Sequence, residues 1–454
     1  MTMMSLALRS LRHRAGGFLA SFLVMFLGAT MLMSFASMLD TAQDKAVDAN
    51  SEETLTTLAG VVGGWGLLLV VFAVTSTLTL SVQQRSSDMA LLRSAGATPG
   101  QVTRMIMSEA AVLSVLASLL AVPSAIFSGR ALLEVLIDTD QVLPAVSYHF
   151  GPIALGMGVG ITFVAATLAA TLAARRTARM RVAQAAAEAA TGTRRLGRIR
   201  IAAAVLFLAG GINLGVMTVV LEHKKTAEIM QTAGSASILV AIGLALLSPL
   251  LLRAVTAVLG APLQRLTGVS GYLTVQNVRR RADRLGTVLM PIILFVGIGT
   301  GTFYMQAIEN AATTAEGITK TTEQRNIETL NFVVIGTVVL FACIMLVNVL
   351  IAATTHRGRE FGQQRLVGAT PRQVLRMVGA EGVLLALTGV LFGSIAALAT
   401  VLPFTVARTE DVVPDTSLAI YLTIVAIAAG VTLLASTATA RRRLRTPAVE
   451  AVAA

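Results

Sequence analysis

The sequence predicts an all-α membrane protein that crosses the bilayer ten times, and three observations support this fold class. Of the 454 residues, 55% are hydrophobic and only 13% are charged, whereas soluble domains carry about 25% charged residues. Apolar runs of about 20 residues recur along the chain, enough to cross a hydrocarbon core roughly 30 Å thick. Basic residues collect between alternate runs. A β-barrel would instead show short segments of alternating hydrophobicity.

The predicted spans form two groups of four with a pair between them. They are expected at 17–38, 58–81, 105–128, 152–174, then 201–221 and 233–256, then 285–307, 330–353, 378–402 and 417–438. We therefore predict a first unit at 1–190, a linker with the central pair at 191–262, and a second unit at 263–454. Pro123, Pro249 and Pro291 are compatible with kinks or with the ordinary tolerance of proline in membrane helices.

The first apolar run resembles a signal peptide in one respect, because Arg9, Arg12 and Arg14 precede it. Its apolar stretch is longer than the usual core of about 7–15 residues. The segment LRHRA at 11–15 also has a counterpart in VRRRA at 278–282, directly before the seventh run. We therefore expect a retained transmembrane helix.

The basic residues predict the orientation. Seven of the 36 lysines and arginines fall in the odd-numbered loops, which leaves 29 for the two termini and the even-numbered loops. By the positive-inside rule, both termini face the cytoplasm. The same distribution explains the net charge of +12 without nucleic acid, since the chain has no separate basic domain with stacking aromatic residues.

The residue types argue against several other classes of protein. The single Cys343 lies in an apolar run and the four histidines are scattered, so we expect no metal site. No lysine follows a glycine, as a phosphate-binding P-loop requires. The spans have almost no charge at mid-depth and the two units run parallel, unlike secondary transporters with inverted repeats. An intramembrane enzyme would need acid–base groups that converge at one depth.

A polar segment occurs twice between these apolar runs. Arg85–Glu109 returns without a gap at Arg357–Glu381, at an offset of 272 residues, and Asp88/Glu360 keeps its charge. Eleven positions are identical: Arg85/Arg357, Arg93/Arg365, Gly96/Gly368, Ala97/Ala369, Thr98/Thr370, Pro99/Pro371, Gln101/Gln373, Val102/Val374, Arg104/Arg376, Met105/Met377 and Glu109/Glu381. A repeated water-facing element in a membrane chain indicates a docking surface that is used twice.

Each copy predicts a joint between a short surface helix and the span that follows. Gly96 suits the left-handed position that ends a helix. Thr98 is a good N-cap, Pro99 at the first helical position loses no needed donor, and Gln101 completes a capping box. The second copy repeats the pattern with Gly368, Ala369, Thr370, Pro371 and Gln373.

Glu109 and Glu381 should lie about two turns into their helices, near the membrane boundary. A carboxylate at that depth is costly unless it is paired or hydrated. One interpretation is a polar anchor to neighbouring basic helices that transmits motion. The other is an interfacial residue whose side chain reaches towards water.

These motifs together resemble the FtsX-like permease domain of ABC transporters. The shared pattern is an acidic residue, an arginine, Gly-Ala-Thr-Pro-x-Gln and then a span, with a basic helix before the first span of each unit. The closing run at 440–442, followed by TPAVEA at 446–451, also matches. The resemblance covers both four-span units and implies a permease in the bacterial plasma membrane.

The resemblance also implies a partner. In this family the short cytoplasmic helix docks into a groove on a separate ATPase subunit, which binds the ATP, so the chain itself is expected to be neither an enzyme nor a cofactor-binding protein. One permease with two docking sites would bind two ATPase copies. The implied coupling residues are Arg85, Asp88, Arg93, Gly96, Ala97, Thr98, Pro99 and Gln101, and then Arg357, Glu360, Arg365, Gly368, Ala369, Thr370, Pro371 and Gln373.

Two functions remain open under this resemblance. The first is export or extraction of an amphiphilic or lipophilic substrate such as an antimicrobial peptide, a drug or a lipid. The second is mechanotransmission that regulates an extracytoplasmic partner such as a cell-wall hydrolase. The outside segments 39–57 and 308–329 are short, which disfavours a MacB-type tripartite pump and a lipoprotein extractor. Bacitracin-resistance permeases, similar in span number, carry a large outside domain before the eighth span.

Overall fold

The computed structural model describes residues 15–44, 47–84, 89, 91, 92, 94–178, 197–220, 226–315, 322–355, 357–409, 414 and 416–453. All regular secondary structure in these residues is helical. Ten of the described helices are long and apolar enough to cross a membrane. The predicted all-α polytopic fold is therefore confirmed.

The chain divides into two compact units. Unit 1 comprises Met1–Ala185 and Gly317–Phe341, and unit 2 comprises Ala186–Glu316 and Ala342–Ala454. The central pair of helices therefore groups with the second repeat in unit 2. The sequence-based division at 190 and 262 remains a prediction.

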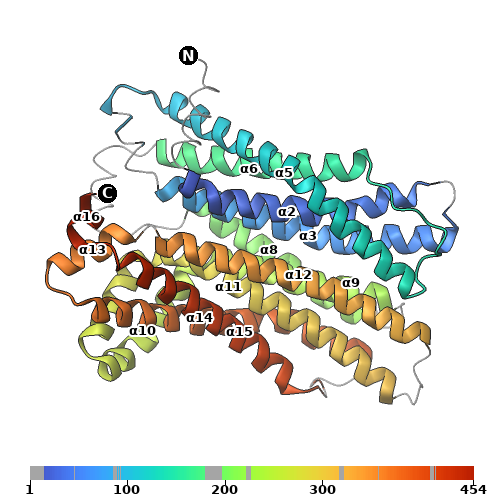
Figure 1. The fold of residues 1–454 in the computed structure, drawn as a ribbon. Coiled ribbons are helices and arrows are strands. Elements are labelled where there is room, and N and C mark those ends of the chain that lie inside the picture. Colours follow the sequence, from blue (N-terminus) through green and yellow to red (C-terminus); the bar gives the residue numbers. More distant parts are fainter. Residues whose placement is uncertain are drawn as a thin grey trace. The chain divides into compact units, whose positions relative to one another are not determined.

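Unit 1 contains the first four spans as α2 (Ala15–Ala42), α3 (Ala49–Gln84), α5 (Pro99–Asp138) and α6 (Pro152–Ala178). Helix α2 packs against the other three, and α6 also packs against α3 and α5 (Figure 1). Asp40 near the end of α2 caps the start of α6, where its carboxylate accepts hydrogen bonds from the backbone N–H groups of Ile153 at 3.1 Å and Ala154 at 2.7 Å. This cap satisfies amide groups that a helix start leaves without partners.

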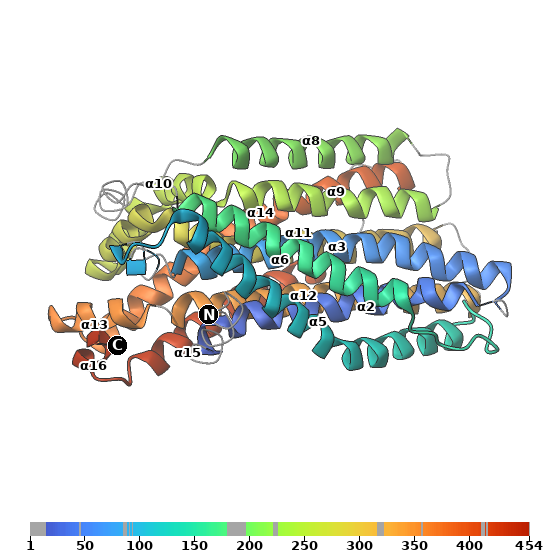
Figure 2. The same cartoon turned by 90° about the horizontal axis from the view of Figure 1, so that it is seen from above.

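Unit 2 contains the remaining helices. They are α8 (Arg198–Val220), α9 (Thr226–Leu246), α10 (Ser248–Thr267), α11 (Val269–Ala315), α13 (Gly358–Leu366), α14 (Pro371–Thr409), α15 (Leu418–Arg443), α16 (Ala448–Ala453) and the second part of α12 (Thr322–Thr355). The most extensive contact joins α11 and α14. Helix α9 packs on both of them and α8 covers α9 and α14 (Figure 2).

The predicted C-terminal boundary of the sixth span, 233–256, is wrong. The helix that crosses the membrane ends at Leu246, and a second helix starts at Ser248. Pro249 sits in the first turn of α10, where its missing N–H is tolerated, but it cannot continue a preceding helix. Pro123 and Pro291, in contrast, lie inside α5 and α11.

Two pairs of hydroxyl groups join α2 and α5 in unit 1. Thr30 Oγ1 lies 2.9 Å from Ser124 Oγ, and one turn later Ser34 Oγ lies 2.5 Å from Ser128 Oγ. Interhelical hydrogen bonds of this kind, together with small side chains, hold membrane helices together where the lipid provides no hydrophobic driving force.

The residues of unit 2 that correspond to these hydroxyl pairs also face each other. Their numbers are higher by 267 on the first helix of the unit and by 272 on the third. They are Gly297 opposite Ala396 and Gly301 opposite Thr400. Here the contact is made by close packing, and α9 joins it, because Thr400 Oγ1 donates to the carbonyl oxygen of Ala233 and accepts from the N–H of Ser237 at 3.2 Å. Both units therefore pack their first and third helices in the same register, with different side chains.

Close packing of α11 on α14 should make Gly393 sensitive to one added methyl group. A Cβ at Gly393 would lie 2.6 Å from Val296 Cβ and 3.1 Å from the carbonyl oxygen of Ile293, so we expect Gly393→Ala to cost about 1–3 kcal/mol. The control is Gly379→Ala on the same helix, where no atom lies within 4 Å and alanine is the better helix former by roughly 1 kcal/mol. The midpoint of thermal unfolding in detergent should fall only for the first variant. Equal midpoints would contradict this packing.

Candidate functional site

Both copies of the repeated segment form the predicted joint with the same hydrogen bonds. The N–H of Thr98 donates to Gln101 Oε1 at 2.8 Å, and the N–H of Gln101 donates to Thr98 Oγ1 at 3.3 Å. The corresponding distances for Thr370 and Gln373 are also 2.8 and 3.3 Å. These reciprocal bonds are a capping box, and they fix the point at which α5 and α14 begin.

The turn before each cap depends on a glycine. Gly96 has φ 95° and Gly368 has φ 105°, in the left-handed region that other residues rarely adopt. The alanine after each glycine donates its N–H backwards. Ala97 donates to the carbonyl oxygen of Leu92 at 3.0 Å, and Ala369 donates to the carbonyl oxygen of Gln364 at 2.9 Å. Each joint thus closes the preceding turn and starts the next helix within a few residues.

The two copies differ in how much of the segment the structure describes. In the second copy Arg357, Glu360 and Arg365 lie on or next to α13, as expected. In the first copy Arg85, Asp88 and Arg93 lie outside the described residues.

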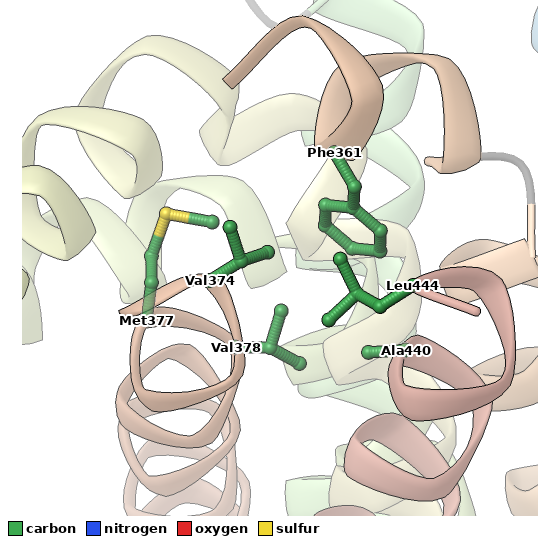
Figure 3. Close-up of a cluster of buried hydrophobic side chains, with 6 residues drawn as sticks. All are labelled: Phe361, Val374, Met377, Val378, Ala440 and Leu444. Carbon is green, nitrogen blue, oxygen red and sulfur yellow. The ribbon is translucent and has the colours of Figure 1, made fainter. Parts of the chain in front are cut away.

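A buried hydrophobic cluster holds α13 against the ends of two spans. Figure 3 shows the ring of Phe361 on α13 directed between α14 and α15. Its neighbours in the cluster are Val374, Met377, Val378, Ala440 and Leu444. Burying an aromatic ring together with aliphatic side chains gives α13 a stabilising contact that its 9 residues would not supply alone.

The first copy buries residues at the same positions. Met89, Val102 and Ile106, which correspond to Phe361, Val374 and Val378 at the offset of 272, are all buried. Ala174, the counterpart of Ala440, is also buried. These positions below the joint are thus buried in both copies.

Glu381 is bound by an arginine from the start of the segment. Arg357 Nη1 donates to Glu381 Oε2 at 2.5 Å and its Nη2 donates to Oε1 at 3.2 Å, while Asn277 Nδ2 on α11 donates to Oε1 at 3.1 Å. Glu381 is 2% exposed, and its counterpart in the first copy, Glu109, is 1% exposed. A buried, bidentate ion pair supports the anchor interpretation of Glu381 over a side chain that reaches to water.

A second carboxylate extends the network to α11. Glu360 on α13 accepts hydrogen bonds from Arg357 Nε at 3.2 Å and Nη2 at 3.3 Å, and it forms an ion pair with Arg281. Arg281 is the one residue within α11 whose backbone departs from helical geometry, with φ −121° and ψ 18°. The network therefore connects α13 with α14 and with a kink in α11.

The charges in the network stabilise each other. Burial alone would lower the pKa of Arg357, but the Glu381 and Glu360 carboxylates outweigh it and raise the pKa above the usual value. Burial alone would raise the pKa of Glu360, but Arg357 and Arg281 outweigh it and lower the pKa. Both side chains therefore remain charged at neutral pH.

Helix α16 supports the other side of α13. Arg365 Nη1 donates to the carbonyl oxygens of Leu444 at 3.2 Å and Thr446 at 2.7 Å. A Cβ on Gly362 would lie 3.0 Å from the carbonyl oxygen of Ala448, so the glycine allows α16 to approach. The closing TPAVEA motif is thus part of the support of the joint.

Sequence reasoning missed the large apolar side chains at the tips of both joints. Leu366 and Val367 are 55% and 90% exposed, and Leu91 and Leu92 are 68% and 40% exposed. The signal was present as a pair of apolar residues shortly before the glycine of each repeated turn. Exposed apolar groups on a polar surface are typical of contact sites for another protein.

Comparison with known proteins identifies the repeated pattern. A family model described as FtsX-like permease C-terminal matches the chain in two segments, residues 60–182 and 332–448. Each segment contains one joint and the helices on either side of it. No curated protein matches the chain.

The Arg357–Glu381 pair can be tested by a double-mutant cycle on thermal stability. Arg357→Gln leaves the buried Glu381 carboxylate without its counter-charge and should cost about 3–5 kcal/mol. Glu381→Gln should cost less, because the Arg357 guanidinium remains paired with Glu360. The double variant should cost less than the sum of the two. Arg359→Gln provides the control on the same helix, because Arg359 is exposed and its loss should change stability by less than roughly 0.5 kcal/mol. Additive effects of the two variants would show that the pair is not a coupled contact.

Proposed function

The chain belongs to the FtsX-like permease family, whose members are membrane permease components of ABC-type systems, and we propose that it couples ATP hydrolysis by a separate ATPase to the movement of an amphiphilic or lipophilic substrate. The substrate would be exported or extracted from the membrane. The observation that carries the proposal is the capped joint, present twice, with an exposed apolar tip and a buried support.

The tip of each joint is the proposed ATPase contact. At the second joint Leu366 and Val367 are exposed beside Arg372, and at the first joint Leu91 and Leu92 are exposed. An apolar anchor with a polar rim is the usual composition of a protein interface. Two such tips support a partner that binds in two copies, and the ATP would be bound by that partner.

The ion pairs give the proposed contact a mechanical connection. Force on α13 would reach α14 through Arg357 and Glu381, and α11 through Glu360 and Arg281. Glu381, and by repetition Glu109, would therefore act in transmission. The stiff cap at Thr370 would keep the direction of the force defined, because it leaves no flexible linker between the joint and the span.

The side of the membrane follows from the charge distribution, and we place both joints and both termini in the cytoplasm. The basic residues Arg441, Arg442 and Arg443 lie in the last turn of α15, at the end of unit 2 that carries α13 and α16. Asp40, in contrast, lies near the C-terminal end of α2, which we place on the outside of the membrane. Cytoplasmic loops are the ones enriched in arginine.

Regulation of an extracytoplasmic enzyme, without transport, is the alternative use of the same coupling. Vesicles that contain the permease and its ATPase would distinguish the two. Transport predicts ATP-dependent redistribution of a fluorescent amphiphile, abolished when the ATPase is inactive. Regulation predicts no redistribution, together with capture of a cell-wall hydrolase by the permease.

The docking proposal predicts that charge at the tips will uncouple the two subunits. Val367→Glu combined with Leu91→Glu should reduce permease-stimulated ATPase activity at least about tenfold, because a carboxylate would be buried at the contact. The matched control is Ile199→Glu, since Ile199 at the start of α8 is 87% exposed and belongs to neither joint. The assignment fails if the double variant stimulates the ATPase as the native chain does, or if the control is equally inactive.

The orientation predicts the behaviour of reporter fusions. Green fluorescent protein fused after residue 454 should fluoresce, and alkaline phosphatase at the same place should be inactive, because the C-terminus would lie in the cytoplasm. A fusion after Asp140, in the loop between α5 and α6, should give the opposite pattern. The reverse result at both positions would overturn the orientation.

A further inference from the structure

A basic pocket lies in unit 2 beside the joint helix. It has a volume of about 470 Å³ and is lined by Ile351, Thr355, Ala435, Ala438, Thr439, Arg442, Arg443 and Thr446. These residues come from the last turns of α12 and α15 and from the link to α16. From this pocket we infer a binding site for the phosphate headgroup of an anionic phospholipid.

The polar side chains of the pocket suit an anionic phosphate group. Two guanidinium groups and three threonine hydroxyls are present, and no carboxylate is among the lining residues. Guanidinium groups bind phosphate oxygens in bidentate geometry, and threonine hydroxyls can donate to the remaining oxygens. The net charge of +2 favours a headgroup with a net negative charge over a zwitterionic one.

The position of the pocket favours a lipid over a soluble anion. The membrane spans of α12 and α15 end at Thr355 and Arg443, so the charged end of the pocket lies at the level of the headgroups. Its apolar residues, Ile351, Ala435 and Ala438, lie one to two turns deeper. Hydrogen-bond donors for a phosphate above an apolar groove match a lipid headgroup followed by its acyl chains. Basic pockets between membrane helices are known to bind such headgroups.

The site borders the support of the joint. A Cβ on Gly358, the first residue of α13, would lie 3.7 Å from Arg443 Cδ. The carbonyl oxygen of Thr446, another lining residue, accepts the hydrogen bond from Arg365 on α13. A lipid bound here would therefore contact residues that hold α13 in place.

The first copy lacks the key residues of this site. At the offset of 266, Arg443 corresponds to Thr177, Thr439 to Ala173, and Ala438 to the larger Leu172. The first copy therefore has one cation fewer, lacks the hydroxyl of Thr439, and has a leucine in place of the small Ala438. The lipid site belongs to the second copy alone.

Exchange of these residues between the copies tests the proposal on the purified full chain. The variant Thr439→Ala with Arg443→Thr introduces residues from the first copy, and Arg441→Thr removes an equal charge from a neighbouring exposed residue outside the pocket. The measurement is the unfolding midpoint in detergent with dioleoyl phosphatidylglycerol, dioleoyl phosphatidylcholine or inorganic phosphate. The native chain and Arg441→Thr should gain about 5 °C from phosphatidylglycerol over phosphatidylcholine. The pocket variant should lose this gain.

A second variant decides the question if the first does not fold. Ala438→Leu keeps both arginines and fills the cavity, and it should also lose the gain from phosphatidylglycerol. The proposal is overturned if phosphatidylcholine stabilises the native chain equally, or if the folded pocket variants keep the gain. It is also overturned if Arg441→Thr loses the gain, since the effect would then follow total charge. If inorganic phosphate alone gives the full gain, the ligand is a soluble anion and the lipid assignment is wrong.

Discussion

The pairing of the half-buried Arg357 guanidinium with two carboxylates is the interaction on which the joint of unit 2 depends. It is bonded to Glu381 on α14 and to Glu360 on α13, and Glu360 is in turn paired with Arg281 on α11. A charge at this depth is tolerated only with its partners present. Helices α11 and α14 must therefore both be in place before the short helix α13 can hold its position.

The two repeats bury the same described positions around the joint but differ in what surrounds them. Hydroxyl pairs join the first and third helices of unit 1, whereas glycine contacts do so in unit 2 and leave room for α9. The tips carry their apolar residues at different positions of the repeat, and the basic pocket requires Arg443, which the first copy replaces with Thr177. The two joints are therefore similar but not equivalent.

The local parts of the fold and of the site could be predicted from the sequence. The joint is determined by neighbours within six residues, so Gly96, Thr98 and Gln101 specify it without any knowledge of tertiary packing. Hydropathy likewise predicted the ten spans, because burial in lipid depends on composition over a whole helix. The break at Leu247 was missed because a proline inside an apolar run is compatible both with a kink and with a new helix.

Contacts between residues far apart in the sequence could not be predicted in the same way. Arg357 and Glu381 are separated by a turn and two helix segments, and the sequence does not state their distance. Their one signal was that both belong to the identical positions of the repeat. The exposed side chains of Leu366 and Val367 were hidden for the opposite reason, since apolar residues next to a glycine turn are expected to be buried.

The length of α14 gives the cap at Thr370 a geometric consequence. The helix is 39 residues long and thus extends about 60 Å from a base fixed by the capping box and by Glu381. If it moves as a rigid rod, a tilt of only about 5° at that base displaces the far end by about 5 Å, close to one helical turn. A small change at the base of the helix is thereby amplified into a displacement of several ångström at its far end.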